Sequence, residues 1–288
     1  MNTLIIKHPD PKAKKIVFFH GFGLPSATYL PFLEGLSDNF TVYAVDHLGM
    51  GCSGRPPIKY TKLNAEQIVT LFVSVYESWR AELKFEKINF VCHSLGAYFA
   101  ILYAKKYSHR VANIFTMSAP MLTDFPEGFS VRKLNLPPKR IFIYVFWSFM
   151  NRRFIHGFNC FSMLPLRWSL KMWMKGRNNF PPESKDAIVE YMALQFWDPN
   201  FSGDIVTELC GYLSFTKHFP LINEMPFLKE KGIPVKFVFG EKDWIDFRHF
   251  EKESGIQGIE VIEGGNHQIP INDSDKVCAM VNEFFKDK

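Results

Sequence analysis

The sequence predicts an α/β fold in which a mostly parallel central sheet is flanked by helices. Short runs of β-branched and aromatic residues alternate with longer stretches whose apolar residues recur at helical spacing, a pattern typical of consecutive βαβ units. Most of the short runs are apolar at nearly every position, as expected for strands that helices cover on both faces. The length of 288 residues allows one large domain of this kind or two small ones.

Six segments are expected to form the central strands, and three are expected to form helices around them. The strands are Ile16–His20, Thr41–Asp46, Ile88–Cys92, Asn113–Met117, Val235–Gly240 and Glu260–Glu263. The helices are Asn64–Leu83, Ser94–Tyr107 and a last helix that begins after Asn272, with Asp273 or Ser274 as its cap.

The alternation stops between about Leu122 and Lys231, where helical stretches continue without a convincing strand, and it resumes at Val235. The strands on either side of this interval need each other to complete one sheet. We therefore expect residues 1–121 and 232–288 to form the core of a single domain. Residues 122–231 are expected to form a helical cap inserted over the carboxyl ends of the strands.

The cysteines indicate a reducing compartment, and the apolar runs are too short for a membrane-spanning segment. Five cysteines without a CxxC pair argue against a disulfide framework or a zinc site and favour a reducing compartment. The N-terminus lacks the apolar core of a signal peptide. No apolar run approaches the roughly 20 residues that cross a bilayer. We expect a cytoplasmic protein or one peripheral to an intracellular membrane.

A serine stands at a tight turn between an expected strand and an expected helix. In Phe90-Val-Cys-His-Ser94-Leu-Gly96, an apolar strand runs into small residues and then directly into a helix. This is the nucleophile-elbow arrangement, which lifts a hydroxyl to the top of a sheet. Cys92 replaces the first glycine of the G-x-S-x-G pattern, and Gly96 is retained. The alternative is an ordinary serine at a helix N-terminus.

An acid and a histidine follow Ser94 in the chain, each after a later strand. Asp243 lies three residues past the glycine that ends one strand, and His267 lies in a glycine-rich loop after the next. An imidazole held by a carboxylate can take the proton of a serine hydroxyl, so the three residues predict a catalytic Ser-Asp-His set. Asp246 is a fallback acid, further from the strand end.

The strand that ends at His20 leads into another glycine turn, His20-Gly-Phe22-Gly. A tetrahedral intermediate needs backbone N–H donors at its oxyanion. We expect the amides of Phe22 and Leu95, the residue after Ser94, to supply them. His20 is more consistent with a residue that braces this loop than with a catalytic base.

The segment from Asp46 to Pro56 contains glycines near a G-x-G spacing. A dinucleotide fingerprint would need a third glycine and a helix directly after it, whereas Pro56 and Pro57 follow here. We therefore predict a shaped loop near the site.

These motifs resemble the phospholipid-lipase branch of the α/β hydrolases. That branch includes lysophospholipid and N-acyl-phosphatidylethanolamine lipases, a mitochondrial cardiolipin-specific lipase and a lipid-droplet co-activator of triglyceride lipase. The resemblance covers nearly the whole chain, weakly in the cap, and implies an α/β-hydrolase fold. The motifs that carry it are His20-Gly-Phe-Gly, Asp46-His-Leu-Gly-Met-Gly-Cys-Ser-Gly-Arg-Pro, Glu77-Ser-Trp-Arg80, Cys92-His-Ser-Leu-Gly-Ala and Gly240-Glu-Lys-Asp-Trp-Ile-Asp246.

Two details refine what the resemblance implies. The co-activator member lacks the nucleophilic serine, whereas this chain retains Ser94, which favours an active hydrolase. Members of the branch tend to carry His-x-x-x-x-Asp, which is linked to acyltransferase activity. Here Asn272 stands at the fifth position after His267, and Asp273 comes one residue late, which argues against acyl transfer.

The expected cap combines basic and aromatic residues. Between Glu127 and Glu183 there are ten Lys or Arg, twelve aromatic residues and no acidic residue. Such a composition suits an anionic membrane surface, and it includes Ile141–Met150, then Asn-Arg152-Arg153, then Trp168–Met174. The alternative is that the aromatics pack the cap onto the core. A nucleic-acid partner is not expected, because large aliphatics separate the basic residues and no nucleic-acid motif is present.

The expected activity is hydrolysis of an acyl ester of a phospholipid or lysophospholipid through an acyl-enzyme, without a metal or organic cofactor. The phospholipid substrate and a mitochondrial location are implied by the resemblance alone. Two alternatives stay open: a carboxylesterase for small soluble esters, and a catalytically silent subunit that uses the fold as a binding scaffold.

Overall fold

The structure is a computed structural model that describes residues 1–59, 62–123, 164–177, 180–197, 202, 219–254, 256 and 258–286. Of the expected membrane-contact segment, Ile141–Met150 and Arg152-Arg153 lie outside the described residues, and Trp168–Met174 lies within them. The boundaries of the cap therefore stay a prediction.

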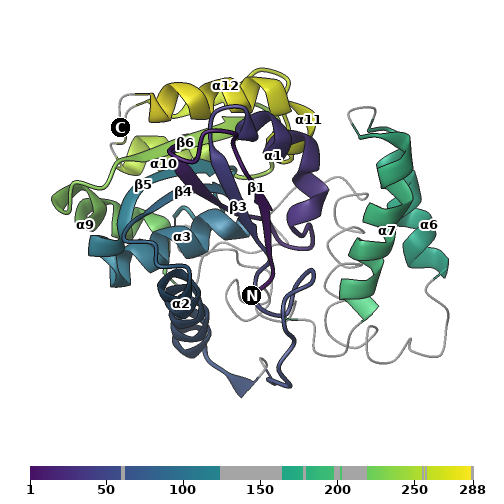
Figure 1. The fold of residues 1–288 in the computed structure, drawn as a ribbon. Coiled ribbons are helices and arrows are strands. Elements are labelled where there is room, and N and C mark those ends of the chain that lie inside the picture. The colour runs from purple at the N-terminus through teal and green to yellow at the C-terminus, as the bar shows by residue number, and fades with distance from the viewer. Residues whose placement is uncertain are drawn as a thin grey trace, which may run out of the picture.

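A seven-stranded sheet forms the centre of the molecule, in the order β1-β3-β2-β4-β5-β6-β7 (Figure 1). All neighbouring strands are parallel except β1, which pairs antiparallel with β3 at one edge. The six expected strands are confirmed with ends shifted by at most two residues, and the sequence analysis missed β1. The strands are β1 (Thr3–Ile6), β2 (Lys15–Phe19), β3 (Thr41–Val45), β4 (Ile88–His93), β5 (Val111–Met117), β6 (Val235–Gly240) and β7 (Glu260–Ile262).

Helices cover both faces of the sheet, and each face has its own apolar core (Figure 1). Helices α1 and α12 pack against each other on one face, and α2, α3 and α9 lie on the other. The described helices of the core are α1 (Leu30–Ser37), α2 (Ala65–Glu82), α3 (Leu95–Lys106), α9 (Met225–Glu230), α10 (Phe247–Ser254), α11 (Ile269–Asn272) and α12 (Ser274–Phe285). Short 3-10 turns lie at Ser26–Tyr29 (η1), Ser108–Arg110 (η3) and Leu221–Glu224 (η6).

The ends of the expected helices show how side chains set them. Asn64 accepts a hydrogen bond from the Gln67 amide while the Gln67 side chain accepts one from the Asn64 amide, so a reciprocal capping box starts α2. Asp273 occupies the N-cap position of α12 as expected, but its side chain makes no capping hydrogen bond there.

Two helices of the expected cap are described, α6 (Leu164–Lys175) and α7 (Pro182–Trp197). They pack against each other, and Arg167 and Glu190 join them with an ion pair of 2.7 Å. They stand beside the sheet rather than on either of its faces (Figure 1). No helix in the described part of the chain is both long enough and apolar enough to cross a membrane.

Candidate active site

Ser94 occupies a strained turn between β4 and α3. Its backbone angles, φ 49° and ψ −122°, lie in a region that side chains rarely adopt, and its amide donates to the Met117 carbonyl at 2.9 Å. Gly96 makes this turn feasible, because a Cβ at this position would lie 2.3 Å from the Phe19 carbonyl oxygen. The turn thus places the Ser94 hydroxyl at the carboxyl edge of the sheet.

His267 and Asp243 lie beside Ser94 at the same edge. The Nε2 atom of His267 is 3.0 Å from the Ser94 hydroxyl oxygen, and its Nδ1 atom is 3.0 Å from an Asp243 carboxylate oxygen. Nδ1–H therefore donates to the carboxylate, which leaves Nε2 free to accept the serine proton. The structure brings together the three residues that the sequence analysis placed after three separate strands.

The loops that carry Asp243 and His267 pack directly on each other. A Cβ at Gly240 would lie 2.5 Å from the backbone of Gly265, so only glycine permits this approach. The Lys242 amide donates to the Gly265 carbonyl at 2.8 Å across the same junction. These contacts hold the carboxylate opposite the imidazole.

Burial and hydrogen bonding compete at the Asp243 carboxyl, whose side chain has no exposed surface. Burial alone would raise its pKa, but the hydrogen bond from His267 and the Ile245 amide outweigh it and leave the pKa below its ordinary value. Asp243 is therefore an anion that can stabilise a protonated imidazole. Asp246, the fallback acid, is exposed and accepts a hydrogen bond from the His249 amide instead.

His93, which the sequence analysis did not single out, connects His267 to the turn after β2. Its Nε2–H donates to the His267 carbonyl at 2.7 Å, and its Nδ1 accepts from the Tyr29 hydroxyl at 2.8 Å. The same hydroxyl accepts from the Gly21 amide at 3.1 Å. Burial lowers the pKa of His93 to about 3, so the ring is neutral, as these donor and acceptor roles require.

The two expected oxyanion donors, Leu95 and Phe22, stay predictions, and the structure shows what surrounds each of them. Leu95 is the first residue of α3, so its amide belongs to the helix N-terminus, where N–H groups have no partner within the helix. Phe22 lies between Gly21, held by Tyr29, and Gly23, whose carbonyl accepts from the Gln195 side chain at 2.8 Å. Neighbouring contacts thus hold the Phe22 turn on both sides.

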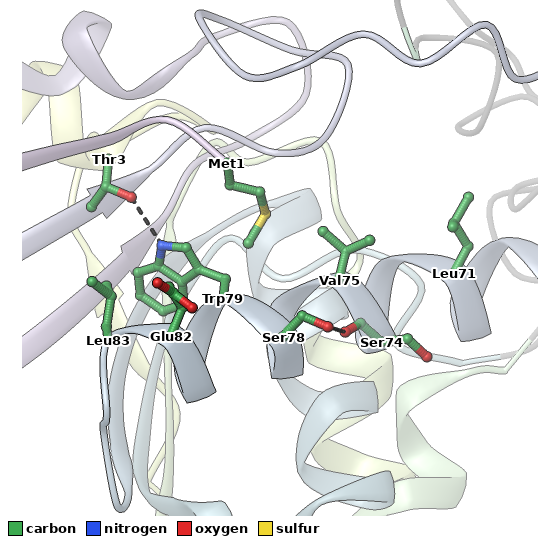
Figure 2. A pocket seen from close by; sticks show the side chains of 9 residues that line it. All are labelled: Met1, Thr3, Leu71, Ser74, Val75, Ser78, Trp79, Glu82 and Leu83. Atoms are coloured by element: carbon green, nitrogen blue, oxygen red, sulfur yellow. Dashed lines mark hydrogen bonds between the residues drawn. The ribbon is translucent and has the colours of Figure 1, made fainter.

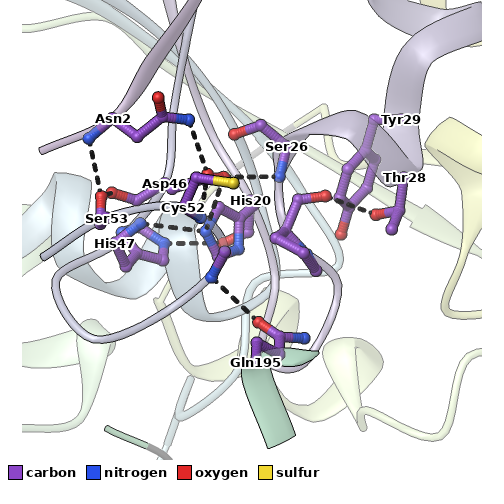
Figure 3. A network of polar contacts seen from close by, with 12 residues as sticks. Asn2, His20, Ser26, Thr28, Tyr29, Asp46, His47, Cys52, Ser53 and Gln195 are labelled. Carbon is purple, nitrogen blue, oxygen red and sulfur yellow. Dashed lines mark hydrogen bonds and ion pairs between the residues drawn. The ribbon is translucent and has the colours of Figure 1, made fainter. Parts of the chain in front are cut away.

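His20 braces the loops around the turn rather than contacting Ser94. Its Nδ1–H donates to the Gly21 carbonyl, and its Nε2 accepts from the His47 amide at 3.0 Å (Figure 3). His47 returns a hydrogen bond to the His20 carbonyl at 2.8 Å. Burial lowers the pKa of both rings, so both are neutral.

The loop after β3 is organised around Asp46, a buried carboxylate (Figure 3). It accepts from the Ser26 and Cys52 amides, the Asn2 side chain and the Tyr191 hydroxyl, all within 3.0 Å. Burial alone would raise its pKa, but the hydrogen bonds from the Tyr191 hydroxyl and from the Cys52 and Ser26 amides leave it below its ordinary value. Asp46 therefore joins the N-terminal segment, the start of η1 and helix α7.

Helix α7 is also fastened to these loops by the buried side chain of Gln195 (Figure 3). Gln195 accepts from the Gly51 amide at 3.1 Å and donates to the Gly23 carbonyl at 2.8 Å. No sequence signal pointed to Gln195 or Tyr191, because neither belongs to a motif. The tertiary structure alone places helix α7 against the turn that contains Phe22.

The cavity drawn in Figure 2 is separate from this site. It holds about 500 Å³ between the outer side of α2 and the N-terminal strand, and its lining includes Met1, Val75 and Trp79. None of its lining residues belongs to the Ser94–His267–Asp243 set.

The arrangement around Ser94 supports nucleophilic chemistry at a carbonyl or a similar centre. It combines a hydroxyl, an imidazole that can accept its proton and a buried anion that orients the imidazole. Among the described residues, no group of three or more His, Cys, Asp or Glu side chains is placed to hold a metal ion.

Comparisons with known proteins agree with the fold. Abhydrolase domain-containing protein abhd-5.2 of Caenorhabditis elegans is 28% identical over 287 residues, which is 98% of this chain but only 61% of that protein. The human (lyso)-N-acylphosphatidylethanolamine lipase is 25% identical over 295 residues. The match covers 98% of this chain and 82% of that protein. The 1-acylglycerol-3-phosphate O-acyltransferase ICT1 of Saccharomyces cerevisiae is 24% identical over 80% of this chain and 69% of its own.

A solved structure and a family model show the same architecture. The 2-hydroxy-6-oxo-6-phenylhexa-2,4-dienoate hydrolase of Rhodococcus superimposes with a TM-score of 0.70 over 99% of this chain and 94% of its own, at 18% identity. The model of the alpha/beta hydrolase fold matches residues 14–255. The chain therefore belongs to the α/β-hydrolase fold family.

Proposed function

We propose that this protein is a serine hydrolase that cleaves an acyl ester of a phospholipid or lysophospholipid. The observation that carries the proposal is the pair of hydrogen bonds, each 3.0 Å, that joins Ser94, His267 and Asp243. Three residues from three loops meet in the order and geometry that serine catalysis requires.

In the proposed reaction, the Ser94 hydroxyl oxygen attacks the ester carbonyl carbon while His267 Nε2 takes the hydroxyl proton. The amides of Phe22 and Leu95 donate to the oxyanion that forms. His267 then gives the proton to the departing alcohol, which leaves an acyl group on Ser94. Water, deprotonated by His267, attacks this ester and releases the fatty acid. Asp243 stabilises the imidazolium in both steps.

The phospholipid class is supported by the relatives and by apolar side chains around the site. The human relative carries the name of a (lyso)-N-acylphosphatidylethanolamine lipase and the yeast relative that of a 1-acylglycerol-3-phosphate O-acyltransferase. Trp244 is 48% exposed, and its ring centroid lies 4.9 Å from that of His267. An indole at this position can contact an acyl chain next to the reacting ester.

Contact of the cap with an anionic membrane is part of the same proposal. On α6, Trp168 and Met172 are 67% and 52% exposed. They are four residues apart, so they share one side of the helix, and the exposed Lys171 and Lys175 lie on the same helix. An exposed indole beside lysines suits the headgroup zone of a bilayer.

A fluorophosphonate probe with peptide mapping tests the central claim. We expect an adduct on Ser94 that is lost in Ser94→Ala. Ser78→Ala removes an exposed hydroxyl on α2 and should label like the wild type. A folded wild-type protein that stays unlabelled, with and without anionic vesicles, would favour the silent scaffold over the hydrolase.

Nitrophenyl esters of increasing chain length and phospholipid dispersions then test the substrate class. A preference for long acyl chains together with release of fatty acid from phospholipid supports the proposal. A sharp optimum at acetyl without phospholipid hydrolysis would instead indicate a carboxylesterase for small soluble esters.

Acyl transfer is a second candidate, which the name of the yeast relative favours. The acyl group on Ser94 would then pass to the hydroxyl of a lysophospholipid instead of to water. The ratio of diacyl product to free fatty acid, measured with a labelled acyl donor and an added lysophosphatidate, separates the two reactions.

A further inference from the structure

Arg177, two residues after the end of helix α6, reaches the loop that carries His267. Its guanidinium carbon lies 3.4 Å from the centroid of the Trp173 ring, and one of its nitrogens donates to the Trp173 carbonyl. The other terminal nitrogen donates to the side-chain oxygen of Gln268 at 2.5 Å. Because Gln268 directly follows His267, the guanidinium lies where the cap meets the proposed catalytic loop.

The charge of Arg177 has no counterion in the described part of the chain. Two other cap cations are paired across the helices, Arg167 with Glu190 at 2.7 Å and Lys171 with Asp186 at 3.2 Å. Among the described residues, no carboxylate lies within ion-pair distance of Arg177, and its buried Nε–H has no hydrogen-bond acceptor. Burial lowers the pKa of this guanidinium to about 10.

Burying half of a cation without a counterion costs free energy. An anion that pairs with the cation offsets this cost. A guanidinium stacked on an indole is already oriented, so its planar donors can meet two oxygens of a phosphate together. The stack and the Gln268 contact leave Nε–H as an unused donor. The guanidinium, held against Gln268 next to His267, thus has the chemistry to receive an anionic ligand.

We propose that Arg177 binds the phosphate of the lipid substrate and thereby makes the site selective for phosphate-bearing esters. The inference rests on the proposed function and adds the recognition element to it. In a glycerophospholipid, only part of the glycerol unit separates the phosphate from the ester. The names of the human and yeast relatives both refer to lipids that carry a phosphate group, which agrees with this chemistry.

The test uses two short-chain esters that stay monomeric in solution, so that attraction to a membrane surface plays no part. These are 1-hexanoyl-glycerol-3-phosphate and 1-hexanoyl-glycerol, which differ only in the phosphate. The readout is the ratio of kcat/KM for the phosphate ester to that for the neutral ester.

We expect the wild type to favour the phosphate ester and Arg177→Gln to lower the ratio about tenfold or more, which corresponds to about 1.4 kcal/mol. Arg177→Lys, which keeps the charge but loses the planar fork, should give an intermediate ratio. Lys252→Gln is the control, because it removes an exposed cation on α10 that belongs to neither proposed binding surface, and its ratio should equal that of the wild type.

Three results would overturn the proposal: a wild-type ratio near one, equal loss on both esters in Arg177→Gln, or the same fall in ratio in Lys252→Gln. Equal loss would mean that Arg177 only holds Gln268 and the loop in place.

A binding measurement makes the inference independent of catalysis. Calorimetry on Ser94→Ala, with and without Arg177→Gln, should show tighter binding of the phosphate ester that depends on Arg177. If neither ester is hydrolysed but this difference is seen, the hydrolase proposal fails and phosphate recognition stands. Equal binding of both esters by Ser94→Ala would overturn phosphate recognition.

Discussion

His93 makes the protein sensitive to acid, and the size of this effect follows from its burial. The ring is 1% exposed, and its pKa is about 3 in the folded protein against an ordinary value of 6.5. Between these values, the unfolded chain binds a proton that the folded protein excludes. The contribution of His93 to the free energy of unfolding is therefore fully present above pH 6.5. It is lost progressively as the pH is lowered toward 3.

The expected magnitude comes from the interval between the unfolded pKa and the chosen pH. A pH of 5.0 lies about 1.5 pH units below the ordinary pKa of 6.5. At about 1.36 kcal/mol per unit, His93 alone lowers the free energy of unfolding by about 2 kcal/mol relative to pH 7.5. His20 and His47, whose pKa values burial also lowers, add to this loss in the wild type.

The assay is urea unfolding at pH 7.5 and pH 5.0 for the wild type and His93→Gln. Glutamine offers an amide without a titrating proton, so the loss on acidification should be about 2 kcal/mol smaller in the variant. His109→Gln replaces an exposed histidine and should behave like the wild type. An equal loss in the wild type and His93→Gln would refute the reasoning that His93 is held neutral.

Further variants test the site and the cap. Asp243→Asn should lower the rate of fluorophosphonate labelling by about 10³–10⁴-fold, because the orientation of His267 is lost; an unchanged rate would exclude Asp243 as the acid. Gln195→Ala should cost at least about 2 kcal/mol in urea unfolding, since it leaves two buried backbone groups unpaired. Gly96→Ala should cost about 1–3 kcal/mol or more by the same measurement, because its Cβ meets backbone. Trp168→Ala should weaken co-sedimentation with anionic vesicles, and unchanged binding would contradict cap contact.

The sequence predicted the buried parallel strands well, because helices on both faces demand continuous apolar runs. Val235–Gly240 was predicted to the residue. The strand β1 was missed because it is short, lies at the edge of the sheet and is only partly buried, so its pattern is weak. Helix α1 was missed for a similar reason: its eight residues are too few to show a clear period.

The sequence by itself determined which residues carry the proposed chemistry. Ser94, Asp243 and His267 each follow a strand, and parallel strands bring their carboxyl ends to one edge, so chain order alone implied that they meet. The tertiary structure decided what holds them there: His93 under the His267 backbone, Gln195 between the cap and the Phe22 turn, and Arg177 against Gln268. Such contacts join residues far apart in the chain through single side chains, and no local periodicity or spacing records them.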